Sequence, residues 1–247
     1  MNSIYSNIQN SILNREKLLA ILIDPDKFSI ENTIAFIEKV NLSIATHVFV
    51  GGSTVDDDAT ENIVSKIKSL TKLPIVLFPG DVVQITGKAD VILFLSLLSG
   101  RNPEYLIGKH VESVSVLRNT NLEVIPTGYI LIESGNETAV QRVTKTEPIL
   151  RKNTQEIIDT SKAGELLGMK LMYLEAGSGA KQEISQDIIS AVKKELQIPL
   201  IIGGGIRNKQ QLENAYNAGA DMVVIGTAFE NDESFFDELK KNKETRY

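Results

Sequence analysis

Three glycine-containing turns in the second half of the chain are suited to binding a phosphate group. Each follows a short apolar run, and a glycine backbone can approach an anion closely because no Cβ stands in the way. A helix that opens after such a turn adds unpaired N–H groups and a favourable dipole. The turns are Ala176-Gly177-Ser178-Gly179, Gly203-Gly204-Gly205 and Gly226-Thr227. They predict a phosphate site built from neutral donors, with glycines that serve only as tight turns as the alternative.

A tyrosine and a glutamate lie two residues apart just before the first of these turns. Side chains alternate between the two faces of a strand, so Tyr173 and Glu175 should point to the same side. If that side is the mouth of a barrel, Glu175 can take the proton of a hydroxyl group on a phosphorylated substrate. The alternative is a surface acid or a salt-bridge partner. The apolar and glycine neighbours of Glu175 favour the catalytic role.

Two aspartates and a serine follow the first two predicted strands. Asp24 and Asp26 flank Pro25, and Ser53 ends the next glycine-containing turn. Mg²⁺ commonly takes few protein ligands and completes its shell with water and substrate phosphates. Asp24 and Ser53 therefore predict a sparse Mg²⁺ site, although an Asp-Pro-Asp sequence is often only a capped turn. Three basic residues nearby either contact a second phosphate or are solvated, with solvation slightly favoured: Lys27, Arg101 and Arg207.

Apolar side chains gather on the third to fifth predicted strands. Most should belong to the core, but this side offers few polar groups for a substrate. The segment Asp81–Lys88 is also short for a barrel helix and could be a loop or a single turn. We therefore expect a groove for an apolar ligand here, lined from Phe78, Leu93, Phe94, Leu95, Leu97, Leu98, Tyr129 and Leu131.

Alternating apolar runs and helical patterns must position these residues, and they favour parallel strands with helical crossovers. The 247 residues suit one modified (β/α)8 TIM barrel, a single domain over residues 1–247. The predicted strands are Leu18–Ile23, His47–Val50, Ile75–Phe78, Val91–Leu95, Glu123–Thr127 with an extension to Leu131, Lys170–Leu174, the run ending at Ile202, and Met222–Ile225. Helices are predicted for Ser29–Val40, Asp56–Leu70, Pro103–Val116, Thr154–Leu167, Ser185–Leu196, Lys209–Ala218 and Asp232–Lys241, after a polar N-terminal helix.

One connection is longer than usual. Glu133–Asn153 is polar and contains Gly135 and Pro148. Connections of this length often serve as a lid or an oligomer contact, and the sequence leaves both open.

Composition narrows the possible functions. The net charge of -6 and the lack of a basic block argue against nucleic acid as a partner. The absence of cysteine excludes disulfides and thiolate metal sites, and His47 and His110 are too few for a histidine metal cluster. No signal peptide is visible, and the longest apolar run, Val91–Leu98, is too short to span a bilayer. We expect a cytoplasmic protein without a transmembrane segment, able to contact a membrane transiently through an apolar mouth.

The chain resembles the geranylgeranylglyceryl phosphate synthase family and its bacterial heptaprenylglyceryl phosphate synthase relatives. The most specific motif is Tyr173-Leu174-Glu175-Ala176-Gly177-Ser178-Gly179, whereas the triple glycine is shared with many phosphate-binding barrels. The other matching motifs, in the family's order, are Asp24-Pro25-Asp26-Lys27, Val50-Gly51-Gly52-Ser53, Phe78-Pro79-Gly80, Phe94-Leu95-Ser96-Leu97-Leu98, Gly203-Gly204-Gly205-Ile206 and Val224-Ile225-Gly226-Thr227.

This resemblance implies a barrel that lacks one regular helix and an Mg²⁺-dependent prenyltransferase. The reaction would join a prenyl diphosphate, C20 in preference to C35, to the 3-hydroxyl of sn-glycerol 1-phosphate, giving an ether lipid precursor and diphosphate. Asp24 and Ser53 would form the metal site, and the family's dimers and hexamers suggest a homo-oligomer. The residues implied for glycerol 1-phosphate are Tyr173, Leu174, Glu175, Ala176, Gly177, Ser178, Gly179, Gly204, Gly205, Gly226 and Thr227.

Two other functions compete with this one. An isomerase or cyclase of the phosphate-binding barrels would share the glycine turns but would need a sealed, polar mouth and an acid on the fifth strand, which ends in Thr127-Gly128. A non-enzymatic sensor of a phosphorylated metabolite would not require Asp24 and Glu175 to face the same mouth.

Overall fold

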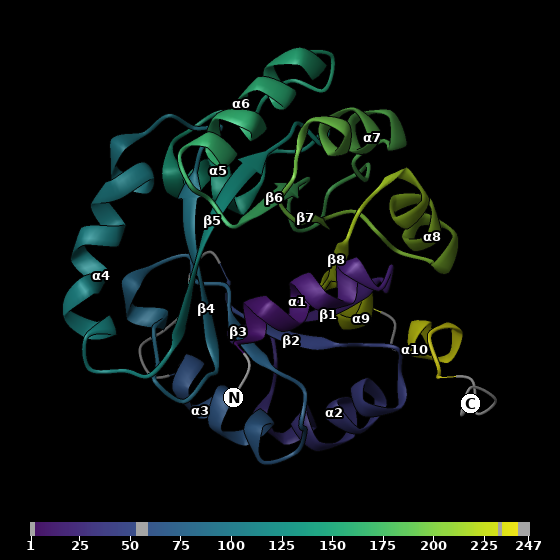
Figure 1. Ribbon diagram of the computed structural model, residues 1–247. Coiled ribbons are helices and arrows are strands. Elements are labelled where there is room, and N and C mark those ends of the chain that lie inside the picture. The colour runs from purple at the N-terminus through teal and green to yellow at the C-terminus, as the bar shows by residue number, and fades with distance from the viewer. Residues whose placement is uncertain (1–2, 53–58, 232–233, 242–247) are drawn as a thin grey trace.

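The computed structural model describes residues 3–52, 59–231 and 234–241. Its centre is a closed barrel of eight parallel strands that follow one another in chain order, with β8 beside β1. Figure 1 shows helices arranged around the outside of this barrel. The strands are β1 (Leu18–Ile23), β2 (His47–Val50), β3 (Ile75–Leu77), β4 (Val91–Leu97), β5 (Glu123–Leu131), β6 (Leu171–Glu175), β7 (Leu200–Gly203) and β8 (Met222–Ile225). The prediction of a (β/α)8 barrel is confirmed.

Alternate residues of each strand fill two different layers. One set, which includes Ala20, Leu93 and Tyr173, packs together inside the barrel. The intervening residues, such as Ile21 and Leu174, pack outward against the helices. Both faces are buried, which explains why the strands appear in the sequence as nearly continuous apolar runs.

The outer layer contains seven α-helices that lie between strands. They are α2 (Thr33–Leu42), α3 (Ala59–Lys68), α4 (Lys109–Leu117), α5 (Ala139–Thr144), α6 (Thr154–Leu166), α7 (Gln186–Glu195) and α8 (Lys209–Ala218). A 3-10 turn, η1 (Ile30–Asn32), precedes α2, and a π-helical turn, η3 (Glu104–Gly108), precedes α4. The predicted helices therefore agree in place with the structure, including the irregular start of the helix after Pro103.

The end of the chain differs from its prediction. The predicted helix covers Asp232–Lys241, of which Asp232 and Glu233 lie outside the described residues. The described residues here form α9 (Thr227–Asn231) and a single turn, α10 (Phe235–Glu238). The helix α10 ends at Glu238 because the residues that follow it bond to the segment after α2. The Leu239 carbonyl accepts a hydrogen bond of 2.8 Å from the Ile44 N–H. Contacts between distant segments outweigh local helix propensity here.

The segment between β3 and β4 holds no α-helix. It forms only the 3-10 turn η2 (Val82–Gln84). This confirms the expected single turn and the expected barrel with one regular helix missing. The ring of helices is consequently thin beside β3 and β4.

The end of the barrel at which the strands begin is closed by α1 (Ile4–Leu13), which lies across the barrel opening (Figure 1). Ile8 is buried in the barrel interior. The carboxylate of Glu123 accepts hydrogen bonds from the first N–H groups of the helix, at 2.6 Å from Ile4 and 2.9 Å from Tyr5. An acid at a helix N-terminus is favourable. Glu123, the first residue of β5, therefore holds α1 at this end of the barrel.

Candidate active site

A cavity of about 830 Å³ opens at the carboxyl ends of the strands. Ligands of (β/α)8 barrels bind at this end. Asp24 from the β1 loop and Glu175 from β6 both border the cavity. One side of it is made of glycine turns and the other of apolar side chains, so the division predicted from the sequence is present in the structure.

The glycine side consists of the three predicted turns. Gly177, Gly204 and Gly205 have positive φ angles of 100°, 80° and 77°, a conformation that favours glycine. The Ser178 and Thr227 hydroxyls lie 3.1 Å apart and so connect the turns after β6 and β8. Most of the residues predicted for phosphate border the cavity, namely Tyr173, Glu175, Gly177, Ser178, Gly179, Gly204, Gly205, Gly226 and Thr227.

Two residues of the predicted set have a different place. Leu174 and Ala176 are fully buried and pack in the outer layer between barrel and helices. They alternate with Tyr173 and Glu175, so their side chains point away from the barrel interior. Their part in the motif is structural packing behind the site.

Glu175 is the last residue of β6 and lies where the glycine side meets the apolar side. It is 6% exposed, which rules out the alternative of a surface acid. Its Oε1 accepts a hydrogen bond of 2.6 Å from the N–H of Gly177. Burial raises the pKa of Glu175 to about 7, partly opposed by the Gly177 hydrogen bond and by the Tyr173 hydroxyl. A carboxyl with this pKa can exchange a proton near neutral pH.

Tyr173 and Glu175 occupy the same side of β6, as predicted. A Cβ placed on Gly203 would lie 2.2 Å from the Tyr173 hydroxyl oxygen and 2.6 Å from Glu175 Oε2, so both oxygens pack directly against the Gly203 backbone. The Tyr173 hydroxyl is buried and has no well-aligned hydrogen-bond partner among the described residues. Burial and then the charge of Glu175 raise the pKa of Tyr173 well above its ordinary value, so the phenol stays protonated.

Asp24 follows β1, the strand between β8 and β2 in the barrel. Its Oδ2 forms an ion pair of 2.7 Å with Lys27, and its Oδ1 accepts from the Asp26 N–H at 3.3 Å. Ser53, its predicted partner, lies outside the described residues. Within the described ranges, no group of three or more acidic or histidine side chains is placed to hold a metal ion. One carboxylate at a site for phosphates is still compatible with Mg²⁺, which often keeps few protein ligands.

The basic residues differ in their place. Arg207 borders the cavity and donates to the Ala180 carbonyl at 2.6 Å, beside the glycine turn after β6. Arg101 forms an ion pair of 3.3 Å with Glu156, and its side chain is 69% exposed. Arg101 therefore fits the solvated alternative, whereas Lys27 and Arg207 lie at the site.

The apolar side is built on β3, β4 and β5. Phe78 stacks on Tyr173 with ring centres 5.2 Å apart and contacts Tyr129 edge-on at 5.8 Å. Six residues of the predicted groove set border the cavity: Phe78, Leu93, Phe94, Leu95, Leu97 and Tyr129. Leu98 and Leu131 do not, because Leu98 packs outward against α6 near Gly164 and Leu131 fills the barrel interior.

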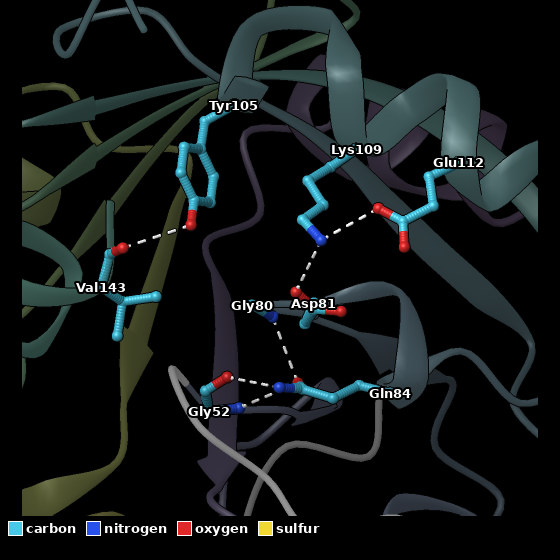
Figure 2. A network of polar contacts seen from close by, with 8 residues as sticks. All are labelled: Gly52, Gly80, Asp81, Gln84, Tyr105, Lys109, Glu112 and Val143. Carbon is cyan, nitrogen blue, oxygen red and sulfur yellow. Dashed lines mark hydrogen bonds and ion pairs between the residues drawn. The ribbon is translucent and has the colours of Figure 1, made fainter. Parts of the chain in front are cut away.

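Two residues of α4, His110 and Lys109, border the cavity although the sequence did not single them out for the site. His110 is 8% exposed and contacts Phe94 edge-on at 4.3 Å, and burial lowers its pKa, so it is neutral in the groove wall. Lys109 bridges Asp81 at 3.0 Å and Glu112 at 2.9 Å (Figure 2). The irregular η3 turn sets the phase of both residues, and helical periodicity could not supply it. His47 is buried at the other end of the barrel, away from the cavity, as an ordinary packed residue.

The long connection also reaches the site. Its helix α5 borders the cavity through Val140 and Val143, and the Tyr105 hydroxyl from η3 donates to the Val143 carbonyl at 3.3 Å (Figure 2). Thr138 caps α5 with a reciprocal bond to Gln141. The segment therefore forms part of the wall of the apolar side.

Comparison with known proteins agrees with this architecture. A relative from Flavobacterium johnsoniae named geranylgeranylglyceryl phosphate synthase is 56% identical over 237 residues, which cover 96% of this chain and 98% of the relative. A relative of the same name from Zunongwangia profunda is 57% identical over 226 residues, covering 92% and 96%. The crystal structure of (S)-3-O-geranylgeranylglyceryl phosphate synthase from Thermoplasma acidophilum, in complex with substrate sn-glycerol-1-phosphate, has 32% identity and a TM-score of 0.91, covering 97% and 96%.

The barrel, the divided cavity and these similarities define a prenyltransferase enzyme with a (β/α)8 fold. A sequence profile of the PcrB family matches residues 11–244. The chain belongs to the PcrB family.

Proposed function

We propose that this chain transfers a prenyl group from a prenyl diphosphate to the 3-hydroxyl of sn-glycerol 1-phosphate, releasing diphosphate and forming an ether lipid precursor. The observation that carries the proposal is the position of Glu175, a buried carboxyl with a pKa of about 7 at the junction of a glycine-lined pocket and an apolar groove. A phosphorylated acceptor and an apolar donor would meet at this carboxyl.

The glycine side is the acceptor pocket in this proposal. The relative from Thermoplasma acidophilum is described with sn-glycerol-1-phosphate bound. In this chain, the turns after β6, β7 and β8 supply backbone N–H groups and two hydroxyls, those of Ser178 and Thr227. Neutral donors of this kind hold a phosphate without a lysine.

The apolar side receives the prenyl chain. Phe78, Leu93 and Phe94 form part of its wall, and the missing helix beside η2 leaves room for a long ligand. We favour geranylgeranyl diphosphate, with a C20 chain, over a C35 donor. An apolar groove that aligns the chain lowers the barrier by orienting the reacting carbon toward the acceptor hydroxyl.

Glu175 is the general base of the proposed step. Its carboxylate takes the proton of the acceptor 3-hydroxyl as that oxygen attacks C1 of the prenyl group; the bond between C1 and the diphosphate oxygen breaks, and its electron pair leaves with the diphosphate. Tyr173, protonated beside Glu175, orients the carboxylate or the acceptor. The Gly177 N–H, which bonds to Glu175 Oε1 at 2.6 Å, holds the carboxylate in place.

We infer that the reaction depends on Mg²⁺ held by Asp24, with Ser53 as the second protein ligand. Bound there, Mg²⁺ supplies positive charge that neutralises the departing diphosphate. Asp24 borders the same cavity as Glu175, on the side where the donor diphosphate would lie. Lys27 forms an ion pair with Asp24 and is therefore placed to contact the negative charge of the donor diphosphate.

The geometry disfavours the two competing functions. A sensor would not require Asp24 and Glu175 on one cavity, yet both border it. An isomerase or cyclase would have a sealed polar mouth, whereas this cavity continues along aromatic and aliphatic side chains.

The test is turnover with Mg²⁺, geranylgeranyl diphosphate and either sn-glycerol 1-phosphate or sn-glycerol 3-phosphate, followed by mass spectrometry. We expect prenylated product from the 1-phosphate only. No product from either acceptor, also with longer prenyl donors, would reject the proposed function. Omitting Mg²⁺ should abolish the product.

Assembly and location follow as smaller proposals. The described residues contain no helix long and apolar enough to cross a membrane. We propose a cytoplasmic homo-oligomer, dimer or hexamer, that contacts a membrane only transiently to collect its donor. Exposed apolar side chains on α4 and α6, such as Val111 and Leu166, supply surface that an oligomer could bury. Light scattering after gel filtration would measure the assembly.

A further inference from the structure

A buried glutamine in the turn that replaces the missing helix joins the loops after two strands. Gln84 is 2% exposed and ends η2. Its Oε1 accepts from the N–H of Gly80 at 3.1 Å and of Gly52 at 3.4 Å, and its Nε2 donates to the Gly52 carbonyl at 2.9 Å. Figure 2 shows these contacts around the Gln84 amide.

The glutamine extends the strand pairing beyond the barrel. Backbone pairing between β2 and β3 includes the hydrogen bond from Phe78 N–H to the Val50 carbonyl at 2.9 Å. Gly52 lies two residues after Val50, and Gly80 lies two residues after Phe78. The Gln84 amide bonds to both and so holds the two loops together.

These loops border the donor half of the cavity. Gly52 lies against Asp24 so closely that a Cβ on it would be 2.6 Å from Asp24 Oδ1. On the other side of the glutamine, Val82 and Ile85 border the apolar groove. Gln84 thus connects the wall beside the Asp24 carboxylate with the wall of the groove.

We propose that Gln84 is a positioning residue for the prenyl donor. By fixing the Gly52 peptide relative to η2, it sets the place of the diphosphate at Asp24 relative to the prenyl chain in the groove. This inference rests on the proposed transferase function and deepens it. The acceptor pocket lies across the cavity, on β6 to β8, so Gln84 acts on the donor and not on glycerol 1-phosphate.

The chemistry of the amide explains why a glutamine suits this place. It both accepts and donates, and it adds no charge beside Asp24. Glutamate could accept from both glycine N–H groups but could not donate to the Gly52 carbonyl, and its charge would repel the donor diphosphate. Methionine would fill a similar volume with none of the three hydrogen bonds and leave part-buried backbone groups of Gly52 and Gly80 without these partners.

The experiment compares Gln84→Met and Gln84→Glu with the wild type in steady-state turnover, varying geranylgeranyl diphosphate and sn-glycerol 1-phosphate separately. We expect Gln84→Met to raise the KM for the donor at least tenfold and to change the KM for the acceptor less than twofold. Gln84→Glu should raise the donor KM at least as much. If Gln84→Met does not fold, Gln84→Asn, which keeps an amide but shortens its reach, replaces it.

A matched control separates positioning from general loss of stability. Thr86 is 4% exposed on the same connection, and its hydroxyl bonds to Glu61 at 2.9 Å, away from the cavity. Thr86→Val also removes a buried polar group, and it should lower the Tm while leaving both KM values within twofold.

An unchanged donor KM in Gln84→Met, an equal rise in both KM values, or the same selective rise in Thr86→Val would overturn the positioning role. Wild-type enzyme without turnover would instead reject the proposed function, and the positioning role with it. The two failures are therefore told apart by the wild-type measurement.

Discussion

The Tyr173 hydroxyl and the Glu175 carboxylate both lie against Gly203, and they occupy the space that its missing side chain leaves. A Cβ on Gly203 would lie 2.2 Å from the hydroxyl oxygen and 2.6 Å from Oε2, far inside van der Waals contact. The triple-glycine turn thus begins with a residue whose missing side chain makes room for the proposed catalytic pair and not for the phosphate.

Filling this space should stop catalysis. We expect Gly203→Ala to lower kcat/KM for the acceptor by at least tenfold, because the carboxylate or the phenol must move. Gly87→Ala is the control, since its Cβ would lie no closer than 3.3 Å to Thr120 and Gly87 does not border the cavity. Steady-state kinetics decides, and equal rates for both variants would contradict the role of Gly203.

Removing the proton acceptor should act on the chemical step. We expect Glu175→Gln to lower kcat by about 10²–10⁴-fold, the usual range for a general base, with glycerol 1-phosphate binding changed far less. Wild-type kcat/KM should rise with pH and reach half its plateau near the Glu175 pKa of about 7. A pH profile and isothermal titration test this, and an unchanged kcat would remove Glu175 from the role.

The same carboxyl should destabilise the protein at alkaline pH. Its pKa is raised by burial from 4.5 to about 7, so the folded state holds the proton more tightly than the unfolded state. Unfolding then releases a proton between these two values, and stability falls as the pH rises through this window and levels off above it. Glu175→Gln should therefore be more stable than the wild type at pH 8, by up to about 3 kcal/mol, and about equal at pH 4. Urea unfolding at both pH values gives the difference.

Much of this site could be predicted from the sequence because its residues follow strands directly. Strand alternation fixes that Tyr173 and Glu175 share a side, and the glycine turns follow strands whose bounds are clear from the apolar runs. The strands β1, β2 and β8 agree with their predicted bounds to the residue. Strand alternation does not show which of the two sets of side chains faces the barrel interior, because the packing of the whole barrel decides this.

Other residues could not be found this way, since irregular segments place them. Gln84 bonds to Gly52, 32 residues earlier, from a 3-10 turn whose direction no periodicity reveals. Lys109 and His110 follow a π-helical turn that shifts the helical phase. The apolar neighbours of Leu98 place it with the predicted groove residues. In the structure Leu98 points outward to the helices, whereas Leu97 points into the barrel.

The proposed metal ligand can be tested through metal dependence. Asp24→Asn keeps the shape of the side chain but removes its charge, so we expect kcat to fall at least 100-fold and half-saturation to need at least tenfold more Mg²⁺. Glycerol 1-phosphate binding should stay within twofold, because the proposed acceptor pocket is formed by the turns after β6, β7 and β8, which do not include Asp24. Asp159→Asn, on the exposed side of α6, controls for the loss of one negative charge. Wild-type Mg²⁺ dependence in Asp24→Asn would argue against this ligand.

The apolar groove can be tested with two matched variants, because side chains two residues apart at η2 lie on different sides, one at the cavity and one in solvent. Ile85 follows the turn and borders the cavity, whereas Val83 is 57% exposed and does not. A lysine at Ile85 would bring a charge into the groove, and a buried charge without a partner is costly. We expect Ile85→Lys to raise the KM for geranylgeranyl diphosphate at least tenfold without a comparable change for glycerol 1-phosphate. Val83→Lys should leave both values within twofold, because its ammonium stays in water. If both lysine variants behaved alike, the prenyl chain would have to lie elsewhere on the barrel.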